Sequence, residues 1–390
     1  FADGPDILAM GAELKNTFCL LRDGHAVMSQ HIGDLQDAVT LADFESNLAL
    51  YTEMYEHQPE VVAVDQHAQY LASQIGQQLA GQQAVPIAEV QHHHAHIAAC
   101  LGDNMRPLTD GPVLGVALDG LGIACNNGEA ELWGGEILLA DYCRFTHLGR
   151  LKPVALPGGH IAMGQPWRNC LAHLHAAVGW QKLSEQYAEL PLVQSLKSQS
   201  ADTLIKMIDN EINSPLSSSC GRLFDAAAAA LGINQQGEIS FEGQAAMAME
   251  ATISDTAWQD AAPWPMVLSE QQGLTEIDPT PLWTALLEDL TTGGAPEIMA
   301  ASFYKSLVVA LAEVLQRLAT SYQLSTVALS GGCFQSPRLQ SALSTELTAA
   351  GLAVLTHHQV PANDGGLSFG QALVAAAQMK SKDRGNSLCV

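Results

Sequence analysis

The order of strand-like and helix-like runs at the start of the chain limits the possible folds most. Three short runs of strand character come first, at residues 7–11, 16–22 and 25–32. Asp23-Gly24, a dipeptide typical of tight hairpins, separates the second run from the third. Apolar residues at helical spacing follow over Phe44–Glu56, and then come a buried strand (61–65), a helix (68–79) and a strand (85–90). The predicted order is therefore β-β-β-α-β-α-β, a hairpin meander followed by parallel crossovers.

This order predicts a ribonuclease-H-like α/β lobe, and a second lobe is expected to follow it. A strand over 113–118 ends in Asp119-Gly120-Leu121-Gly122, and another strand returns over 131–140. We therefore expect duplicated lobes of the actin, sugar kinase and Hsp70 (ASKHA) type with an interlobe cleft, although no residue-level repeat is visible. The expected divisions are residues 1–150 for the first lobe and the start of the second, 151–378 for the second lobe with helical insertions, and 379–390 for a flexible tail.

The second half of the chain is predicted to be mostly helical. Residues 165–231 have helical character, and 298–319 form a long predicted helix. Between them, residues 254–296 are rich in Pro, Trp, Gly and acidic residues, which indicates a loosely structured insertion or a variable helical excursion.

Composition excludes several classes of protein. With 47% hydrophobic and 15% charged residues in 390, the chain is expected to be globular and not disordered. A net charge of −24 argues against a nucleic-acid partner, because such surfaces need Lys and Arg. No apolar run approaches the length of a membrane helix, so we expect no membrane partner. The eight cysteines form no C-x-x-C pair, which favours a reducing cytoplasm over a disulfide framework.

The stretch Gln91–His96 is the strongest candidate for a site. It contains four of the fourteen histidines and lies between two apolar runs. If the second run begins a helix, His92 and His96 are spaced i, i+4 and can bind one metal ion. The alternative is a solvated or core-satisfying histidine cluster. His93 stands where helical zinc proteases have a Glu base, which tells against a metalloprotease.

Asp364, between the last predicted strand and the last helix, has two interpretations. It caps the helix, or it completes a metal site with His92 and His96. A set of two histidines and a carboxylate suits Fe or Zn better than Mg, which prefers oxygen ligands.

Several turns that follow strands contain glycines and could approach a nucleotide. Asp119 can hold a cation while Gly120 and Gly122 bring backbone N–H groups to an anion. Gly331 and Gly332 lie between a strand and a helix, where a ligand can approach the helix N-terminus. Each signal alone is weak, since glycines after strands are common in turns.

Three further polar positions are ambiguous. Lys15, in a turn between the first two strands, could contact a phosphate or a carbonyl oxygen. Asp225 and Glu242 lie near glycines and could hold ribose hydroxyls. For Asp225 and Glu242 the alternative is helix capping plus a surface ion pair, and spacing alone favours this simpler interpretation.

Nine motifs occur in an order that resembles one family. They are LAMGAELKNTFCL (8–20), VQHHHA (90–95), GVALDGLG (115–122), LWGGE (132–136), LPGG (156–159), SSCGRLFD (218–225), FEGQA (241–245), ALSGG (328–332) and NDGGLSFG (363–370). Together they resemble the C-terminal carbamoyltransferase region of the HypF hydrogenase-maturation family, over about residues 7–378. That region is similar to the transferases that make threonylcarbamoyl-adenosine on tRNA and to antibiotic O-carbamoyltransferases.

The resemblance implies a function. HypF proteins form carbamoyl-adenylate from carbamoyl phosphate and ATP, and this region then moves the carbamoyl group to the C-terminal cysteine of HypE, releasing AMP, for the cyanide ligand of NiFe-hydrogenase. The acylphosphatase, zinc-finger and adenylate-forming domains that precede the region in HypF are missing, so we expect an isolated module. The alternatives are a small-molecule or tRNA acceptor, or a non-catalytic metal-binding accessory protein.

The resemblance also implies roles for single residues. His92, His96, Asp119 and Asp364 match the metal ligands, for Fe or Zn, with Mg a further candidate beside the nucleotide. Asp119 also matches the aspartate of the phosphate loop. On physical grounds, and not from the resemblance, we expect Lys15 and loop N–H groups to polarise the carbamoyl carbonyl. The positions that match nucleotide contacts are Gly221, Asp225, Gly243, Gly331 and Gly332, and they join Gly120 and Gly122, the candidate contacts proposed above from their turn. Two residues depart from the family pattern, His160 in place of Asp and Ser336 in place of Asn.

Overall fold

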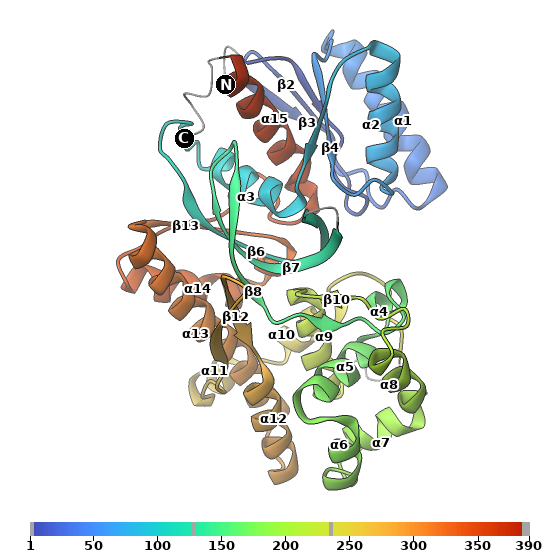
Figure 1. Cartoon of the computed structure of the whole chain (residues 1–390), viewed down its shortest axis with the longest axis vertical. Helices are drawn as coiled ribbons and strands as arrows, with labels where there is room; N and C mark the ends of the chain where they lie inside the picture. Colours follow the sequence, from blue (N-terminus) through green and yellow to red (C-terminus); the bar gives the residue numbers. More distant parts are fainter. Residues whose placement is uncertain (1–3, 127–128, 234–236, 384–390) are drawn as a thin grey trace.

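The computed structural model describes residues 4–126, 129–233 and 237–383, and Figure 1 shows an upper and a lower lobe. The upper lobe contains a five-stranded sheet in the order β3-β2-β1-β4-β5. Its strands are β1 (Ile7–Ala9), β2 (Cys19–Arg22), β3 (His25–Met28), β4 (Val61–Asp65) and β5 (Ile87–Val90). The first three are antiparallel, and β4 and β5 run parallel to β1. Asp23 and Gly24 both have positive φ, as the tight β2–β3 hairpin requires.

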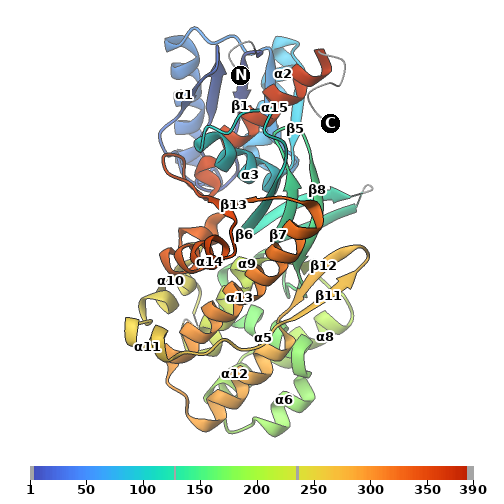
Figure 2. The ribbon, with the colours of Figure 1, turned by 90° about the vertical axis from the view of Figure 1, so that its left-hand side faces the viewer.

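Helices cover both faces of this sheet. They are α1 (Ala38–Met54), α2 (Leu71–Gln83), α3 (His92–Asp103) and α15 (Leu367–Asp383). Alternate residues along the strand point to opposite faces, so Leu8 of β1 and Met10, the residue after it, pack in the core beneath α1 and α2. Ile7 and Ala9 pack in the core formed with α3 and α15. Figures 1 and 2 show α15, from the end of the chain, lying against this N-terminal sheet.

The second sheet repeats the strand order of the first. It has nine strands: β6 (Val113–Asn126), β7 (Glu129–Ala140), β8 (Phe145–Leu151), β9 (Val154–Ala155), β10 (Leu216–Ser217), β11 (Val267–Gln271), β12 (Leu274–Asp278), β13 (Thr326–Ser330) and β14 (Ala353–Leu355). Within it, β8, β7 and β6 are antiparallel neighbours, and β13 and β14 run parallel to β6. The order β8-β7-β6-β13-β14 therefore matches β3-β2-β1-β4-β5 in direction as well, and the duplicated ASKHA-type architecture is confirmed.

Most of the remaining helices lie beside or below the second sheet in Figure 1, where some pack on the sheet and others on neighbouring helices. They are α4 (His160–Gly164), α5 (Pro166–Val178), α6 (Trp180–Gln186), α7 (Pro191–Ser198), α8 (Ala201–Asp209), α9 (Cys220–Ala230), α10 (Gln244–Ala251), α11 (Asp255–Asp260), α12 (Thr280–Thr292), α13 (Pro296–Tyr322) and α14 (Pro337–Ala349), with short 3₁₀ turns η1 (Gly332–Gln335) and η2 (Asp364–Gly366). The alanine-rich α9 is buried along nearly its whole length in the main core.

The prediction of a loosely structured insertion over residues 254–296 is wrong in part. This segment contains α11, the hairpin β11–β12 and α12, and β12 extends the second sheet by pairing parallel to β8. The hairpin turn is formed by Gln272 and Gly273, both with positive φ. Because Gln is uncommon at the first position of such a turn, the sequence did not indicate a hairpin there.

Helix α13 is long and apolar enough to cross a membrane by length and composition, which the sequence interpretation overlooked. Most of its apolar window is buried inside the protein, as expected for the central helix of a folded domain. At the end of the chain, α15 continues to Asp383, and the rest of the predicted tail, residues 384–390, lies outside the described residues.

Candidate metal centre and nucleotide cavity

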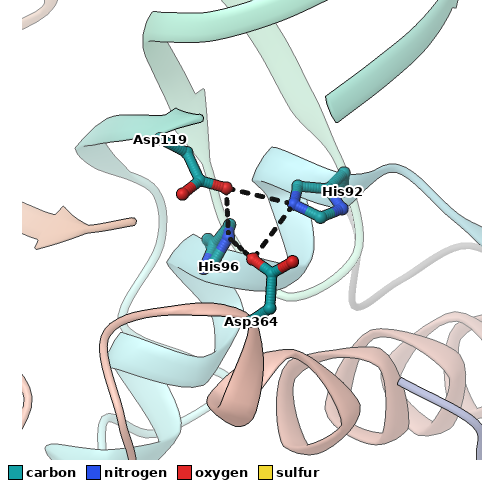
Figure 3. Close-up of side chains that lie close together, drawn as sticks. All are labelled: His92, His96, Asp119 and Asp364. Carbon is teal, nitrogen blue, oxygen red and sulfur yellow. Dashed lines mark hydrogen bonds and ion pairs between the residues drawn. The ribbon is translucent and has the colours of Figure 1, made fainter. Parts of the chain in front are cut away.

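Four side chains from distant parts of the sequence meet in one buried cluster. His92 and His96 come from α3, Asp119 from β6 and Asp364 from η2 (Figure 3). The two histidine Nε2 atoms lie 3.3 and 3.2 Å from Oδ2 of Asp119, and 3.6 and 3.5 Å from Oδ1 of Asp364. One ligand atom from each residue lies within 4.8 Å of every other, so a single metal ion could be held by all four.

Local structure explains the position of the two histidines. Strand β5 ends at Val90, and α3 begins two residues later at His92. Gln91 caps the helix, since its side-chain oxygen accepts a hydrogen bond from the backbone N–H of His94 at 2.7 Å. His92 and His96 are then one helical turn apart, and both rings point to the carboxylates.

Asp119 reaches the cluster because the β6–β7 ladder is interrupted at this point. Leu118 pairs with Gly135 and Gly122 pairs with Trp133, so residues 119–121 of β6 lie opposite one residue of β7. Such a bulge turns side chains away from their regular positions. The other carboxylate oxygen of Asp119 accepts a hydrogen bond from the backbone N–H of Gly332 at 3.0 Å.

Asp364 does not cap the last helix. Asn363 caps the 3₁₀ turn η2 instead, because its side-chain oxygen accepts a hydrogen bond from the N–H of Gly365 at 3.0 Å. The Asp364 carboxylate is thereby free to face the histidines.

A fifth buried residue, Asp65, supports the cluster from behind. Its Oδ2 atom lies 2.8 Å from Nδ1 of His92, so that the Nε2 atom of His92 faces the other carboxylates. A carboxylate behind a histidine fixes the orientation and tautomer of metal-binding imidazoles. The sequence analysis did not identify Asp65 as a site residue. Its position was a signal, because Asp65 is the last residue of the buried strand β4, which pairs with β5 just before the histidines.

The four side chains and Asp65 form a network of opposite charges. Burial works to lower the pKa of His92, but Asp65, Asp119 and Asp364 overcome this effect and hold it well above its usual value. The pKa of His96 is raised in the same way by Asp119 and Asp364. Burial works to raise the pKa of Asp119, and hydrogen bonds from the two histidines outweigh it and hold that pKa well below its usual value.

We predict that Asp65→Asn weakens metal binding without removing a ligand. The amide cannot accept the His92 N–H as strongly as a carboxylate, and loss of such a partner typically lowers metal affinity by about 10- to 100-fold. Competition with a chromogenic chelator measures this. Asp278→Asn is the control, because Asp278 pairs with Lys152 and is outside the cluster. Equal affinities in the two variants would show that the Asp65 contact has no part in metal binding.

The other two histidines of the stretch have different partners. Nδ1 of His93 lies 3.1 Å from the side-chain nitrogen of Gln91, and His94 Nε2 lies 2.6 Å from the carbonyl oxygen of Asp141. Both rings are buried. They are therefore packing residues in this structure and are not among the four residues of the cluster.

A cavity of about 300 Å³ adjoins the cluster at Asp119. Among the predicted nucleotide contacts, Gly120, Gly221, Gly243 and Gly332 line it. Its volume is at the lower end of the range for small-ligand sites. Ser336, one of the two departures from the family pattern, also lines the cavity and caps α14 through a hydrogen bond from the N–H of Leu339.

Three predicted nucleotide contacts lie outside the lining of this cavity. Gly331 has a φ of 102° and packs so closely on the backbone of Leu118 that no side chain fits. Gly122 packs against the rings of His92 and His93. Asp225 is buried and pairs with Arg222 at 3.1 Å, and burial raises the pKa of Asp225 to about 6.

Lys15 lines the nucleotide cavity and forms an ion pair with Glu242. The sequence did not indicate this pairing, since the two residues are separated by most of the chain and only the lobe arrangement brings them together. Glu242 lies over Gly120, where a side chain at residue 120 would collide with its carboxylate.

Family models match both lobes of the chain. Residues 115–371 match the model described as "Carbamoyltransferase, Kae1-like Domain, second subdomain", and residues 2–103 match "HypF Kae1-like domain". The chain belongs to the HypF family. Carbamoyltransferase HypF of Rhodobacter capsulatus is 41% identical over 98% of the chain and 48% of its own length. A HypF homolog of Cupriavidus necator is 36% identical over 97% of the chain and 93% of its own length.

Solved HypF structures have the same fold. Full-length HypF in a phosphate- and nucleotide-bound form superposes with a TM-score of 0.85 at 32% identity, over 96% of this chain and 47% of that one. HypF of T. kodakarensis gives a TM-score of 0.83 at 25% identity, over 97% of this chain and 48% of that one. The chain therefore spans about half the length of most HypF proteins that it matches.

Proposed function

We propose that this chain is a carbamoyltransferase that moves a carbamoyl group from carbamoyl-adenylate to the C-terminal cysteine of HypE during hydrogenase maturation. The observation that carries the proposal is the juxtaposition of a buried two-histidine, two-aspartate cluster with a nucleotide-sized cavity, both lined by Asp119. The phosphate- and nucleotide-bound form of a relative that is 32% identical supports a nucleotide in the same fold. ATP and carbamoyl phosphate would be the source of the adenylate.

The residues of the cluster fit a divalent metal ion. Two imidazoles and two carboxylates, all buried, suit Fe or Zn, and the carboxylate of Asp65 behind His92 is typical of such sites. His92, His96, Asp119 and Asp364 would hold the ion. When bound, it would supply positive charge to phosphate oxygens and to the departing AMP.

The chain's own residues would position the nucleotide. Gly120 and Gly332 let backbone N–H groups approach phosphate oxygens, since neither has a side chain in the way. Lys15, paired with Glu242 at the cavity wall, would turn its ammonium group toward the carbamoyl oxygen or the phosphate. The ion pair with Glu242 also holds the Lys15 ammonium group at the cavity wall before the substrate binds.

The acceptor supplies the nucleophile. Its thiolate sulfur attacks the carbamoyl carbon, a C–S bond forms, and the bond from that carbon to the phosphate oxygen breaks. AMP leaves with the electron pair of that bond, and the proton of the thiol goes to solvent. No nucleophile from this chain is needed.

A thermal-shift experiment separates the transferase from a metal-binding accessory protein. AMP at about 100 times its Kd should stabilise the folded protein by about 2.7 kcal/mol and so raise the Tm. A metal store that binds no nucleotide would show no shift at saturating AMP, and this result would contradict the proposal.

Two tryptophan variants on one helix control the experiment. Ala246→Trp fills the nucleotide cavity from α10 and should abolish the AMP shift. Ala251→Trp places the same ring on the exposed end of that helix and should keep the shift. A full shift in the Ala246 variant would mean that AMP binds elsewhere.

A further inference from the structure

The carboxylate of Glu136 belongs neither to the metal cluster nor to the cavity wall, yet it is completely buried. Glu136 lies on β7, at the end of the motif LWGGE, and is 0% exposed. A carboxylate is costly to bury unless several polar groups compensate it. The Nε2 atom of His147 lies 2.7 Å from its Oε2 atom, and three hydrogen-bond donors converge on its Oε1 atom. These three donors connect Glu136 to the nucleotide cavity.

Two of the three donors are backbone N–H groups of β7 beside the bulge in β6. Gly134 and Gly135 donate to Oε1 of Glu136 at 3.2 and 3.3 Å. Gly134 is the residue of β7 that lies opposite the bulge. A Cβ atom at Gly134 would come within 2.9 Å of the carbonyl oxygen of Asp119 and 3.1 Å of that of Gly120. Glu136 therefore fixes the part of β7 on which the backbone of residues 119 and 120 rests.

The third donor, the hydroxyl of Ser218, connects Glu136 to the same backbone from a different part of the chain. The next residue, Ser219, donates its hydroxyl to the carbonyl oxygen of Gly120. The Ser219 oxygen also accepts a hydrogen bond from the backbone N–H of Arg222 at 3.1 Å and so caps α9. By holding Ser218, Glu136 therefore holds the neighbouring side chain that joins Gly120 to the start of α9.

We propose that Glu136 is a positioning residue for the nucleotide site, because the hydrogen bonds that it accepts hold the peptide unit of Gly120 from two sides. The inference rests on the proposed nucleotide-dependent transfer and adds which residue keeps that site in shape. Gly120 lines the cavity and has no side chain to restrict its backbone, so its conformation depends on such contacts. Glu136 is not among the residues that line the cavity, so it acts without touching the nucleotide.

The start of α9 depends on the same contacts. Gly221 also lines the cavity, and a Cβ atom there would lie 3.0 Å from the Cα atom of Gly120. Loss of the Glu136 contacts should therefore disturb Gly120 and the first turn of α9 together and weaken nucleotide binding. The metal ligands should stay in place, since the carboxylate of Asp119 is held separately by the backbone N–H of Gly332.

Two substitutions of similar size separate hydrogen bonding from packing. Glu136→Leu removes the acceptor and should raise the Kd for AMP about tenfold, because buried donors lose their partner. At about 100 times the wild-type Kd, the stabilisation by AMP then falls from about 2.7 to about 1.4 kcal/mol. Glu136→Gln keeps an acceptor oxygen and should keep the Kd within about threefold of wild type. Calorimetric titration measures the Kd, and metal content should match wild type in both variants.

Ser218→Ala tests the connection through the serines and remains informative if the leucine variant does not fold. It removes one hydroxyl and should raise the Kd for AMP by about three- to tenfold. In the double variant Glu136→Leu/Ser218→Ala, the Kd should rise by less than the product of the two single effects, because both changes break the same contact.

Two buried residues of the same lobe are matched controls. Glu276→Leu changes a glutamate on β12 that is 8% exposed and pairs with Arg150 at 3.5 Å, and it should leave the Kd for AMP unchanged. Ser214→Ala removes a hydroxyl that bonds to the carbonyl oxygen of Ile212 at 3.0 Å, and it should be silent as well.

The outcomes keep this inference apart from the proposed function. If wild-type protein shows the AMP shift and both Glu136→Leu and Ser218→Ala keep its Kd, Glu136 has no positioning role and the proposed function stands. A Kd that rises equally in the leucine and glutamine variants, or single effects that multiply in the double variant, would also overturn the role through these hydrogen bonds. If wild-type protein shows no AMP shift, the proposed function fails, and the positioning role fails with it.

Discussion

The double variant His92→Ala/His96→Ala is expected to lose both bound metal and carbamoyl transfer. Removing two of four ligands should lower bound metal below about a tenth of an equivalent, because the remaining carboxylates do not make a closed site. Transfer should fall by at least about 10³-fold, since charge stabilisation of several kcal/mol is lost and each 1.36 kcal/mol is tenfold in rate. Elemental analysis by mass spectrometry and an AMP-release assay measure the two effects.

A pair of exposed histidines controls for nonspecific metal binding. His25→Ala/His31→Ala removes the same number of imidazoles from the surface and should change neither quantity. Circular dichroism checks that the cluster variant is folded, and Asp364→Asn, which keeps the size of the side chain, provides an independent loss of one ligand. Wild-type metal content in the double variant would refute the site.

The second large effect concerns the contact between α15 and α3. Gly370 of α15 lies against the backbone of Ala95 in α3, and a Cβ atom at residue 370 would overlap the Ala95 carbonyl oxygen. We expect Gly370→Ala to destabilise the protein by about 3 kcal/mol, because two backbones must separate and neither can move as a flexible side chain would. Thermal or denaturant unfolding measures the change.

This substitution should also weaken metal binding. Helix α3 carries His92 and His96, and α15 begins just after Asp364, so separating the helices spreads the four ligand atoms. Gly81→Ala is the matched control in α2, where a Cβ atom meets nothing within 4 Å. There the change should stabilise by about 0.5–1 kcal/mol through helix propensity. A Gly370 variant as stable as the Gly81 variant would show that the helices are not in close contact.

The most accurate predictions from the sequence are the strands and helices that depend on the spacing of neighbouring residues. Strand β4 occupies Val61–Asp65, the range that was predicted, and α3 begins where the histidine stretch required it. The spacing of apolar residues predicts a helix that begins at Phe44, whereas α1 begins at Ala38. Asp37 caps that helix by accepting hydrogen bonds from the N–H groups of Val39 and Thr40, and this cap was the available signal.

Contacts between residues far apart in the chain could not be predicted from the spacing of residues in the sequence. Asp119 and Asp364 join the histidines only because a bulge in β6 and the return of α15 to the first sheet bring them there. From the residues alone, Asp119 was a candidate cation ligand and Asp364 was either a helix cap or a metal ligand, and the family resemblance grouped both with the histidines. Strand β8 (Phe145–Leu151), which completes the second antiparallel meander, was missed because its apolar and polar residues do not alternate regularly. The Lys15–Glu242 pair depends in the same way on how the lobes meet.

The most direct test of the central claim is to follow transfer itself. The purified chain would be mixed with HypE, ATP, carbamoyl phosphate and a separately supplied adenylate-forming half of a HypF protein, and the acceptor analysed by intact mass spectrometry. We predict that HypE gains one carbamoyl group on its C-terminal cysteine, that AMP forms in equal amount, and that both depend on this chain. If HypE gains the same amount of carbamoyl group with and without this chain, the chain is not the transferase.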